Sequence, residues 1–410
     1  MTSLTETVCP FCTLLCENVY TDEERNFACT TAQKSMAILP TVNIYTDNKA
    51  VTRDEALQEA SQLLHKAQSI LYTGLSVDVA GMRSVLNLAR TTGGVVDHQY
   101  SDEFAPYIDA LQHTGGFNTT LTETVNRAEC LLLIGEELEK NYPHLLNQCV
   151  KHQRLFPENI SPPSLLRLAN TEESLNALPE LLAVMNALLL GDEVTDTLSC
   201  SGVSIAQLKA IIQQLQQAKY SVIIWDNAEL PNEHASVIIQ SLYCFIDKMN
   251  TTHRCAALPL GGRHQSSTFM QVMTWQTAYP MRVCFQQGAA HYDIHQYSSQ
   301  RLLASDEIDL VVWIASSTNM SYPDTPHPVI AFAPELPEHL PNPPAVFIPI
   351  GVVGVDHAGY LFRFDQVVTL AVQQIRDCGL PNIATLLPQL LQYYKEAIQQ
   401  DDTENFNNQG

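Results

Sequence analysis

The chain has 410 residues, which is more than one hydrophobic core normally supports, so we expect several domains or subdomains. Hydrophobic residues make up 45% of the sequence, as in ordinary globular proteins, and no run of 18 apolar residues that could span a membrane occurs. The net charge of −22 would repel phosphate backbones, which argues against a nucleic-acid partner.

The cysteine content and the N-terminus indicate the compartment. The first 15 residues lack a basic stretch followed by an apolar one, which argues against a signal peptide. The 11 cysteines are odd in number and scattered from Cys9 to Cys378, unlike a disulfide framework. The sequence therefore predicts a reducing, cytoplasmic location.

Four cysteines near the N-terminus have the spacing C-x2-C-x3-C-x12-C: Cys9, Cys12, Cys16 and Cys29. Such short gaps are typical of a [4Fe–4S] cluster, in which each iron takes one thiolate. The same thiolates could hold a tetrahedral Zn²⁺, although paired C-x2-C units are the commoner zinc pattern. A third interpretation is a relic of a ligand set whose thiols are only buried. The spacing favours the iron–sulfur interpretation and leaves the other two open.

The first half of the remaining chain alternates helix and strand patterns. Thr52 to Glu55 read as a capping box that opens a helix. Further elements are predicted in this order: a strand at 70–72 that ends at Gly74, a helix near 79–89, a strand at 95–96 and a buried strand at 130–135. The continuous apolarity of the last strand indicates a parallel sheet that is covered on both faces.

The second half repeats this pattern. We expect a helix capped at Ser204 that runs to Ala218, a strand at 222–225, a helix at 233–249 and an extended segment at 255–260. Three core strands follow at 310–314, 329–332 and 346–349, and the last helix is expected at 382–399. The chain is therefore predicted to have an α/β fold with mostly parallel sheets covered by helices.

Several motifs resemble one enzyme family. The segment Thr274 to Pro280 reads T-W-Q-T-A-Y-P and resembles the T-W-Q-T-G-Y-P segment in the B subunit of formylmethanofuran dehydrogenase. The run Ile348 to Gly359 resembles the I-P-x-x-x-x-G-x-E-x-x-G segment of that family, with 363–365 continuing it. The C-P-F-C-x-x-x-C motif, 94–97 and 125–129 match further landmarks, so the resemblance covers essentially the whole chain.

This resemblance implies a multi-domain architecture like that of molybdopterin oxidoreductases such as formate dehydrogenase. Residues 1–50 would form a small Cys-rich domain of the [4Fe–4S] type, and 51–400 the formate dehydrogenase-like α/β domains. Residues 401–410 are polar, and we expect them to be a disordered tail. In that family a Cys ligates the pterin-bound metal just after a V-D-N-T segment and is followed by a His.

The chain departs from this pattern at the residues that would ligate the metal. Counted from Asp97, Glu103 stands where the Cys is expected and Phe104 where the His is expected. A carboxylate is a hard ligand and does not replace a thiolate on such a metal. The expected P-M-R-G-H segment reads Pro259 to Arg263, P-L-G-G-R. We therefore expect no molybdopterin or tungstopterin and no catalytic residue in this chain.

The B subunit of the bacterial formyltransferase/hydrolase complex fits this description better, since it looks like a dehydrogenase subunit without redox chemistry. The resemblance then implies a structural role in tetrahydromethanopterin-linked one-carbon metabolism, in which formaldehyde is oxidised to formate. Partners would be the hydrolase (A-like), C-like and formyltransferase (D-like) subunits of the same complex. The family is one of oxidoreductases, so whether this chain is itself an enzyme stays open.

Two alternatives remain. One is an active tungsten or molybdenum dehydrogenase subunit, which would need another metal ligand; Cys130 is the nearby candidate, but it lies in a predicted buried strand. The other is an independent Fe–S electron-transfer protein. His98 and His113 lack metal-ligand spacing, and Asp356 and His357 would point in opposite directions on an extended chain.

Overall fold

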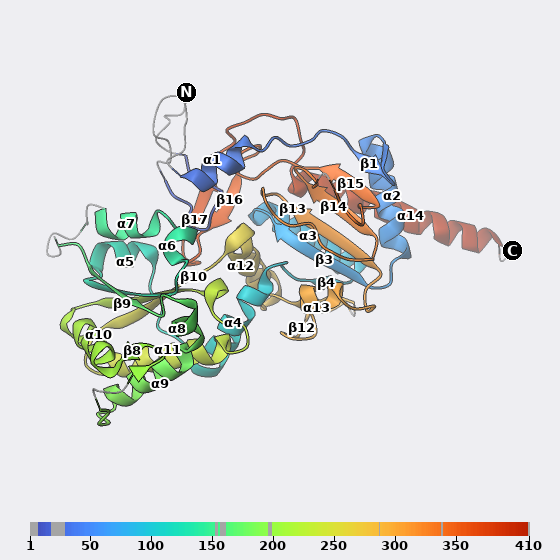
Figure 1. The fold of residues 1–410 in the computed structure, drawn as a ribbon. Helices are drawn as coiled ribbons and strands as arrows, with labels where there is room; N and C mark the ends of the chain where they lie inside the picture. Colours follow the sequence, from blue (N-terminus) through green and yellow to red (C-terminus); the bar gives the residue numbers. More distant parts are fainter. Residues whose placement is uncertain are drawn as a thin grey trace. The chain divides into compact units, whose positions relative to one another are not determined.

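The computed structural model describes residues 7–17, 29–151, 155, 161–195, 199–286, 288–337 and 339–408. The chain divides into two compact units. Unit 1 comprises Met1–Asp102 and Gly262–Gly410, and unit 2 comprises Glu103–Gly261. Each unit has its own sheet and its own helices (Figure 1).

The sheet of unit 1 has nine strands, of which the central five run parallel in the order β4-β3-β13-β14-β15. Short antiparallel strands extend both edges. The two strands of the β16–β17 hairpin form a separate antiparallel pair. The strand bounds are β1 Tyr45–Thr46, β2 Lys49–Ala50, β3 Ile70–Ser76, β4 Val95–Val96, β11 Val283–Cys284, β12 His291–Tyr292, β13 Leu310–Ala315, β14 Val329–Ala333, β15 Val346–Pro349, β16 Gly359–Phe362 and β17 Thr369–Val372.

Helix α14 packs against both α2 and α3 in unit 1, and α2 also contacts β15. Helix α12 packs against α3, β3 and the hairpin strand β16. The helix bounds are α1 Thr30–Ala37, α2 Arg53–Lys66, α3 Val79–Thr92, α12 Ser266–Thr277, α13 Ser299–Leu303 and α14 Ile383–Asn408, with short 3-10 helices η2 Ser101–Glu103 and η4 Arg263–Gln265.

Unit 2 contains a parallel sheet in the order β10-β9-β5-β6 and a small β7–β8 hairpin. Helix α11 packs against α4, α9 and β10, while α10 packs against α9 and β5. The bounds are α4 Ala105–Thr114, α5 Leu121–Arg127, β5 Cys130–Ile134, α6 Leu138–Asn141, α7 Leu145–Lys151, β6 Ser164–Leu168, α8 Glu172–Asn176, α9 Leu178–Leu189, β7 Ser199–Cys200, β8 Val203–Ser204, α10 Ile205–Gln217, β9 Ser221–Asp226, η3 Asn227–Glu229, α11 Ala235–Met249 and β10 Cys255–Leu260.

The α/β fold with parallel sheets is confirmed. Every residue of β5, β9 and β13 is buried, as continuous apolar strands in covered parallel sheets should be. The capping boxes at Thr52 and Ser204 are present, each with both reciprocal hydrogen bonds. Edge strand β6, helix α9 and helix α12 were not predicted, because α12 was interpreted as a motif and β6 follows a Pro-rich segment.

The end of the last helix differs from expectation, and the predicted domain boundaries are not tested by the structure. Helix α14 extends to Asn408, whereas we expected an irregular tail from residue 401. Gln and Glu are good helix formers, so a polar sequence can prolong a helix that is packed further upstream. The Cys-rich domain at 1–50 and the α/β region at 51–400 stay predictions. Among the helices that the structure describes, none is long and apolar enough to cross a membrane.

Candidate functional site

The cysteine-containing loop folds back on itself. The amide of Cys9 donates to the carbonyl of Cys16 at 2.9 Å, and the amide of Leu15 donates to the carbonyl of Cys12 at 3.2 Å. Cys29 is the N-cap residue of α1, and its carbonyl accepts from the amide of Gln33 at 3.0 Å. These bonds shape the C-x2-C-x3-C turn and fix Cys29 at the start of α1.

An apolar shell surrounds the thiols. Cys9 is buried and packs in one cluster with Cys16 and Cys29, together with Phe11, Ala32, Met36 and Ile375. Other parts of unit 1 hold the loop in place. Gln265 donates to the carbonyl of Pro10 at 3.3 Å, and the amide of Phe364 donates to the carbonyl of Thr13 at 3.1 Å.

The thiols lie close enough to shift one another's ionisation. Burial and the neighbouring Cys12 raise the pKa of the Cys9 thiol. The hydrogen bond between Cys12 and Cys16 raises the pKa of Cys16 and lowers the pKa of Cys12. Several thiolates in such a shell repel one another, so together they would need a compensating cation.

The residue types and the shell fit a thiolate-bound metal centre, but the side chains do not converge as ligands. Within the part of the chain that the structure describes, no group of three or more His, Cys, Asp or Glu side chains is placed so that it could hold a metal ion. The assignment of Cys9, Cys12, Cys16 and Cys29 as cluster ligands therefore stays a prediction.

The segment that should ligate a pterin-bound metal is instead held by a buried ionic network. The Asp97 carboxylate is fully buried and accepts from the Ser101 hydroxyl and the Ser299 amide, both at 2.7 Å. The Arg282 guanidinium lies 3.7 Å from the same oxygen and also pairs with Asp102. Burial raises the pKa of Asp97 to about 6, an effect that Arg282 opposes.

Arg282 was not identified from the sequence. It is only 3% exposed and has a left-handed backbone, with φ of 53°. Nothing in the sequence around it predicts a buried cation. One signal could have indicated it: Asp97 lies directly after the buried strand β4, and a buried carboxylate needs a cationic partner.

His98 and His264 lie near this segment and make structural hydrogen bonds; among the described residues, neither belongs to a group that could hold a metal ion. His98 is fully buried, and its Nε2 is 3.0 Å from the carbonyl oxygen of His264. Burial lowers the pKa of His98 to about 3 and the pKa of His264 to about 4, so both rings are neutral at neutral pH. The His264 ring stacks on Tyr100 with ring centroids 4.9 Å apart, and its Nδ1 is 3.3 Å from the Ser317 hydroxyl.

Glu103 and Phe104 occupy the positions at which the resemblance predicts the metal-binding Cys and the following His. Glu103 ends the 3-10 helix η2, and Phe104 precedes α4 as a buried side chain. A Cβ atom added to Gly261 would lie only 2.7 Å from the Phe104 ring, so the ring fills the space in front of this glycine. A buried phenyl ring offers no ligand to a metal, and these residues do not fit the thiolate-ligated pterin metal of the resembled family.

The remaining residues considered in the sequence are Cys130, Asp356, His357 and His113, and each is engaged in packing, an ion pair or hydrogen bonds. Cys130 lies in the buried strand β5, as predicted. Asp356 pairs with Arg376 at 2.6 Å, whereas His357 lies 3.4 Å from the Ser316 hydroxyl. That hydroxyl donates to the carbonyl of Gly351 at 2.7 Å, so it is not poised as a nucleophile. The exposed His113 bonds within its own helix to Asp109.

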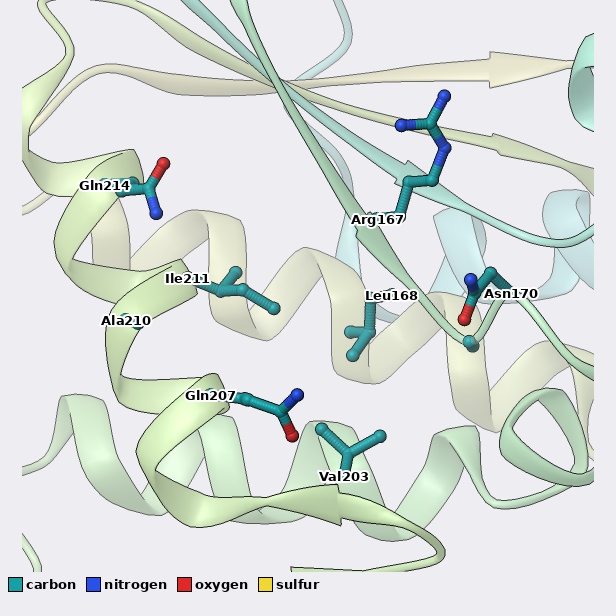
Figure 2. A pocket seen from close by; sticks show the side chains of 9 residues that line it. Arg167, Leu168, Asn170, Val203, Gln207, Ala210, Ile211 and Gln214 are labelled. Carbon is teal, nitrogen blue, oxygen red and sulfur yellow. The ribbon is translucent and has the colours of Figure 1, made fainter.

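A cavity of about 330 Å³ lies in unit 2 where the edge strand β6 ends beside α10. Figure 2 shows the side chains of Leu168 and Ile211 on its walls, with carboxamides of Gln207 and Gln214 projecting from α10. The Arg167 guanidinium lies on the opposite side of β6 from Leu168, as strand alternation requires, and pairs with Glu139. Apart from Arg167, the described residues that line the cavity have amide or aliphatic side chains, and none of them is a nucleophile or a carboxylate.

Comparisons with known proteins agree with the motifs. The B subunit of the formyltransferase/hydrolase complex Fhc of Methylorubrum extorquens is 26% identical over 274 residues, spanning 64% of this chain and 72% of the relative. The B subunit of the tungsten-containing formylmethanofuran dehydrogenase 2 of Methanocaldococcus jannaschii is 25% identical over 397 residues, spanning 88% and 91%. By sequence, the chain is a homologue of these B subunits. The Methanococcus maripaludis counterpart is 23% identical over 396 residues, which again span 88% of this chain.

The fold has a solved counterpart. A chain in the crystal structure of the formyltransferase/hydrolase complex from Methylorubrum extorquens, in complex with methylofuran, superposes with a TM-score of 0.75. The match covers 86% of this chain and 99% of that chain at 23% identity, which establishes a shared fold. No family model matches the sequence.

Proposed function

We propose that the chain is the B subunit of a formyltransferase/hydrolase complex in tetrahydromethanopterin-linked one-carbon metabolism, and that it acts without redox chemistry of its own. Its partners are the hydrolase, C-like and formyltransferase chains. One observation carries the proposal: homology to B subunits extends over 88% of the chain, yet Glu103 and the buried Phe104 stand where a metal ligand and its neighbour are expected.

Sequence similarity to B subunits of both names extends over 64% and 88% of the chain, although the Asp97–Phe104 segment contains no cysteine to ligate a pterin-bound metal. The Asp97–Arg282 network and the Phe104 ring stabilise the segment without a cofactor. A scaffold role requires a stable surface for permanent contacts, which in such complexes bury about 2,000 Å² or more.

We further propose a structural iron–sulfur cluster on Cys9, Cys12, Cys16 and Cys29, within a small Cys-rich N-terminal domain of a molybdopterin-oxidoreductase-like architecture. The support is the ligand spacing and the apolar shell that closes around three of the four residues. Such a cluster would join the loop to α1 by metal–thiolate bonds. Free thiols also fit the reducing cytoplasm, which we propose as the location.

The competing candidate is an active tungsten-containing dehydrogenase subunit, which the names of two relatives favour. Metal analysis of the purified native complex separates the two, with an archaeal tungsten enzyme prepared in parallel as a positive control. We expect neither tungsten nor molybdenum near one equivalent per chain, no extractable pterin and no dye-linked oxidation of the formyl carrier. Tungsten at one equivalent with dye-linked activity would reject the non-redox assignment and leave the B-subunit homology intact.

Co-purification tests whether the chain belongs to such a complex. The chain, tagged in its native host, should be isolated with the hydrolase and formyltransferase chains in fixed stoichiometry. Formation of formate from the formyl carrier should be lost when its gene is deleted and restored by the same gene. A monodisperse monomer whose deletion leaves that activity unchanged would reject the proposal.

A further inference from the structure

The two edges of the sheet in unit 2 differ in how they are covered. At the β10 edge, the amide of Ala257 donates to the carbonyl of Phe117 at 2.7 Å, and the amide of Thr119 donates to the carbonyl of Ala257 at 2.8 Å. At the opposite edge, none of the strands that the structure describes pairs with the outer side of β6. An uncovered edge presents unpaired backbone groups to which a further strand can bind.

The hydrogen bonds of β6 show which of its backbone groups point outward. The amide of Ser164 donates to the carbonyl of Glu129, which directly precedes β5, at 2.9 Å. In a parallel ladder every second residue bonds to the same neighbour, so the amides and carbonyls of Leu165 and Arg167 point away from β5. These two residues form the hydrogen-bonding edge that a further strand would meet.

Strand β6 also lacks the features that usually keep an edge from pairing. Leu165 and Leu166 are only partly buried, the strand contains no Pro, and its pairing with β5 has no bulge. Its single charged residue, Arg167, forms an ion pair with Glu139. A flat edge with exposed apolar side chains and little free charge favours the addition of another strand.

A second copy of β6 matches this edge when the two strands run antiparallel with Leu166 on a two-fold axis. Leu165 of each copy then faces Arg167 of the other, and all their outward amides and carbonyls are hydrogen-bonded. Leu166 faces itself across the axis as a pair whose side chains are close, so two partly exposed leucines cover each other. This pairing therefore satisfies backbone groups and apolar side chains of both copies together.

The neighbouring registers are less favourable, which selects this one. An axis at Leu165 would place Arg167 opposite Pro163, which has no amide hydrogen to donate. An axis at Arg167 would place the two Arg167 side chains opposite each other, and like charges in that position are destabilising. Shifts by a single residue would pair the outward groups of one copy with the inward groups of the other.

The same register brings the second copy to the cavity beside β6 (Figure 2). Pro163 and Pro162 of the second copy would follow opposite Ala169 and Asn170, which line this cavity of about 330 Å³. Leu168 provides an aliphatic wall for a Pro ring. The ladder ends there because Pro has no amide hydrogen and Ala169 has a left-handed backbone, with φ of 55°.

The acidic charge of the chain sets the conditions for this association. Two copies with a net charge of −22 repel each other at long range. At a physiological ionic strength of about 0.15 M the Debye length is about 8 Å, so only charges near the contact act strongly. Within β6 that charge is Arg167, and Glu139 neutralises it. Self-association is therefore expected at physiological salt and should weaken as the salt is lowered.

We infer that β6 is a self-association site, at which a second copy of this chain adds its own β6 antiparallel about an axis at Leu166. The two parallel sheets of unit 2 then form one continuous sheet. The inference goes beyond the proposed function, because it assigns a contact between two copies of this chain and uses neither redox nor hydrolase chemistry. Its consequence is that a complex built on this chain contains two copies of it.

Disulfide cross-linking tests the register in the full-length chain. Leu166→Cys would place two Cα atoms about 4.5 Å apart across the axis, within the range of a disulfide. We expect mild oxidation at physiological salt to give a covalent dimer of this variant. Leu165→Cys is the matched control, because Leu165 faces Arg167 of the other copy; alone it should stay monomeric on a non-reducing denaturing gel, and it should cross-link when mixed with Arg167→Cys. The wild type under the same oxidation measures the background reaction of the chain's own cysteines.

Sedimentation of the full-length chain measures the affinity. Leu166→Lys would set two ammonium groups opposite each other on the axis, and one substitution alters both sides of the contact. We expect it to raise the dissociation constant of the dimer at least about tenfold. Leu190→Lys is the control, because Leu190 is 68% exposed at the end of α9, and it should dimerise as the wild type does. Thermal unfolding checks the folding of each variant; cross-linking of Leu166→Cys, which introduces no charge, decides the result if Leu166→Lys is unfolded.

Three outcomes overturn the inference. A wild type that sediments as a monomer at every concentration, with no cross-linking of Leu166→Cys, shows that β6 does not self-associate. Cross-linking of Leu165→Cys to itself, with none of Leu166→Cys, shows that the axis is wrong. A purified complex with one copy of this chain, from which Leu166→Lys releases a different chain, shows that the edge has another occupant. None of these outcomes affects the B-subunit assignment, which is tested by metal analysis and co-purification.

Discussion

Two regions that the resemblance associates with redox chemistry differ from each other in this chain. The N-terminal loop keeps all four cysteines at cluster spacing, in an apolar shell with Phe11 and Ile375. The segment from Asp97 to Phe104 contains no cysteine, and Asp97 at its start belongs to a buried carboxylate–guanidinium pair. Metal–thiolate bonds are the proposed stabilising link in the first region, whereas side-chain packing and ionic bonds stabilise the second.

A metal centre that links two segments and one that only serves catalysis differ in what they contribute to folding. A cluster that joins a loop to a helix contributes to folding even when no electron passes through it. Where the resemblance expects a His beside a pterin-bound metal, the Phe104 ring packs against Gly261, 2.7 Å from where a Cβ atom on that glycine would lie.

The largest expected effect comes from removing a cluster ligand. We expect Cys12→Ser to abolish iron–thiolate absorbance near about 400 nm and to lower the free energy of unfolding by several kcal/mol, on the order of a lost structural metal site. Anaerobic purification, iron and sulfide analysis and urea unfolding measure this. Cys244→Ser is the control, because Cys244 is an exposed free thiol outside the loop. Wild-type protein without iron would contradict the cluster.

The buried ionic network around Asp97 is tested by replacing Arg282. Arg282→Leu leaves the Asp97 carboxylate buried with no opposite charge, so the acid takes up a proton in the variant; at pH 7, one unit above the wild-type pKa, this should cost about 1.4 kcal/mol. Without Arg282 the pKa of Asp97 rises above its wild-type value of about 6. Below pH 6, Asp97 is neutral in both proteins, so the difference in the free energy of unfolding is small. As the pH rises through 6, Asp97 ionises in the wild type and this difference grows.

Urea unfolding of both proteins from pH 5 to pH 8 measures this dependence. Arg301→Leu is the matched control, since Arg301 and Glu307 form a half-exposed surface pair whose loss should cost less than about 1 kcal/mol. An Arg282→Leu penalty that stays constant across this pH range would show that Asp97 does not couple to Arg282.

The packing of Phe104, which stands where the resemblance predicts a His, can be tested at Gly261. Gly261→Ala would place a Cβ 2.7 Å from the Phe104 ring, at a backbone φ of 152°. We expect destabilisation of about 1–3 kcal/mol from overpacking and backbone strain together. Gly115→Ala has positive φ but nothing within 4 Å of the added Cβ, so it isolates the strain. Equal losses in the two variants would mean that the Phe104 ring yields freely.

The smallest predicted effect concerns another departure from the resembled motif. Ala278 stands where the family segment T-W-Q-T-G-Y-P has Gly, and it ends α12 in a left-handed conformation with φ of 67°. Ala278→Gly should relieve this strain and raise the free energy of unfolding by about 0.5–1 kcal/mol, measurable as a higher midpoint in urea. A lower midpoint would show that the Ala278 methyl group makes favourable contacts.

Elements whose signals are local could be predicted from the residues alone. Strands such as Leu310–Ala315 are recognisable because parallel strands covered on both faces must be continuously apolar. The helices after Thr52 and Ser204 are recognisable because a capping box satisfies backbone groups within four residues. The homology to B subunits and the absence of a cysteine between Asp97 and Phe104 were also readable from the residues alone.

Only the tertiary structure decided which distant residues meet. The pairing of Arg282 with Asp97 joins residues far apart in the chain, and no local pattern encodes it. Likewise, α12 was hidden because a helix covered on several faces lacks an amphipathic period, and seven of its twelve residues are buried. Trp275 meets Phe362 because α12 and the β16–β17 hairpin pack together in three dimensions, and burial and exposure are properties of that packing.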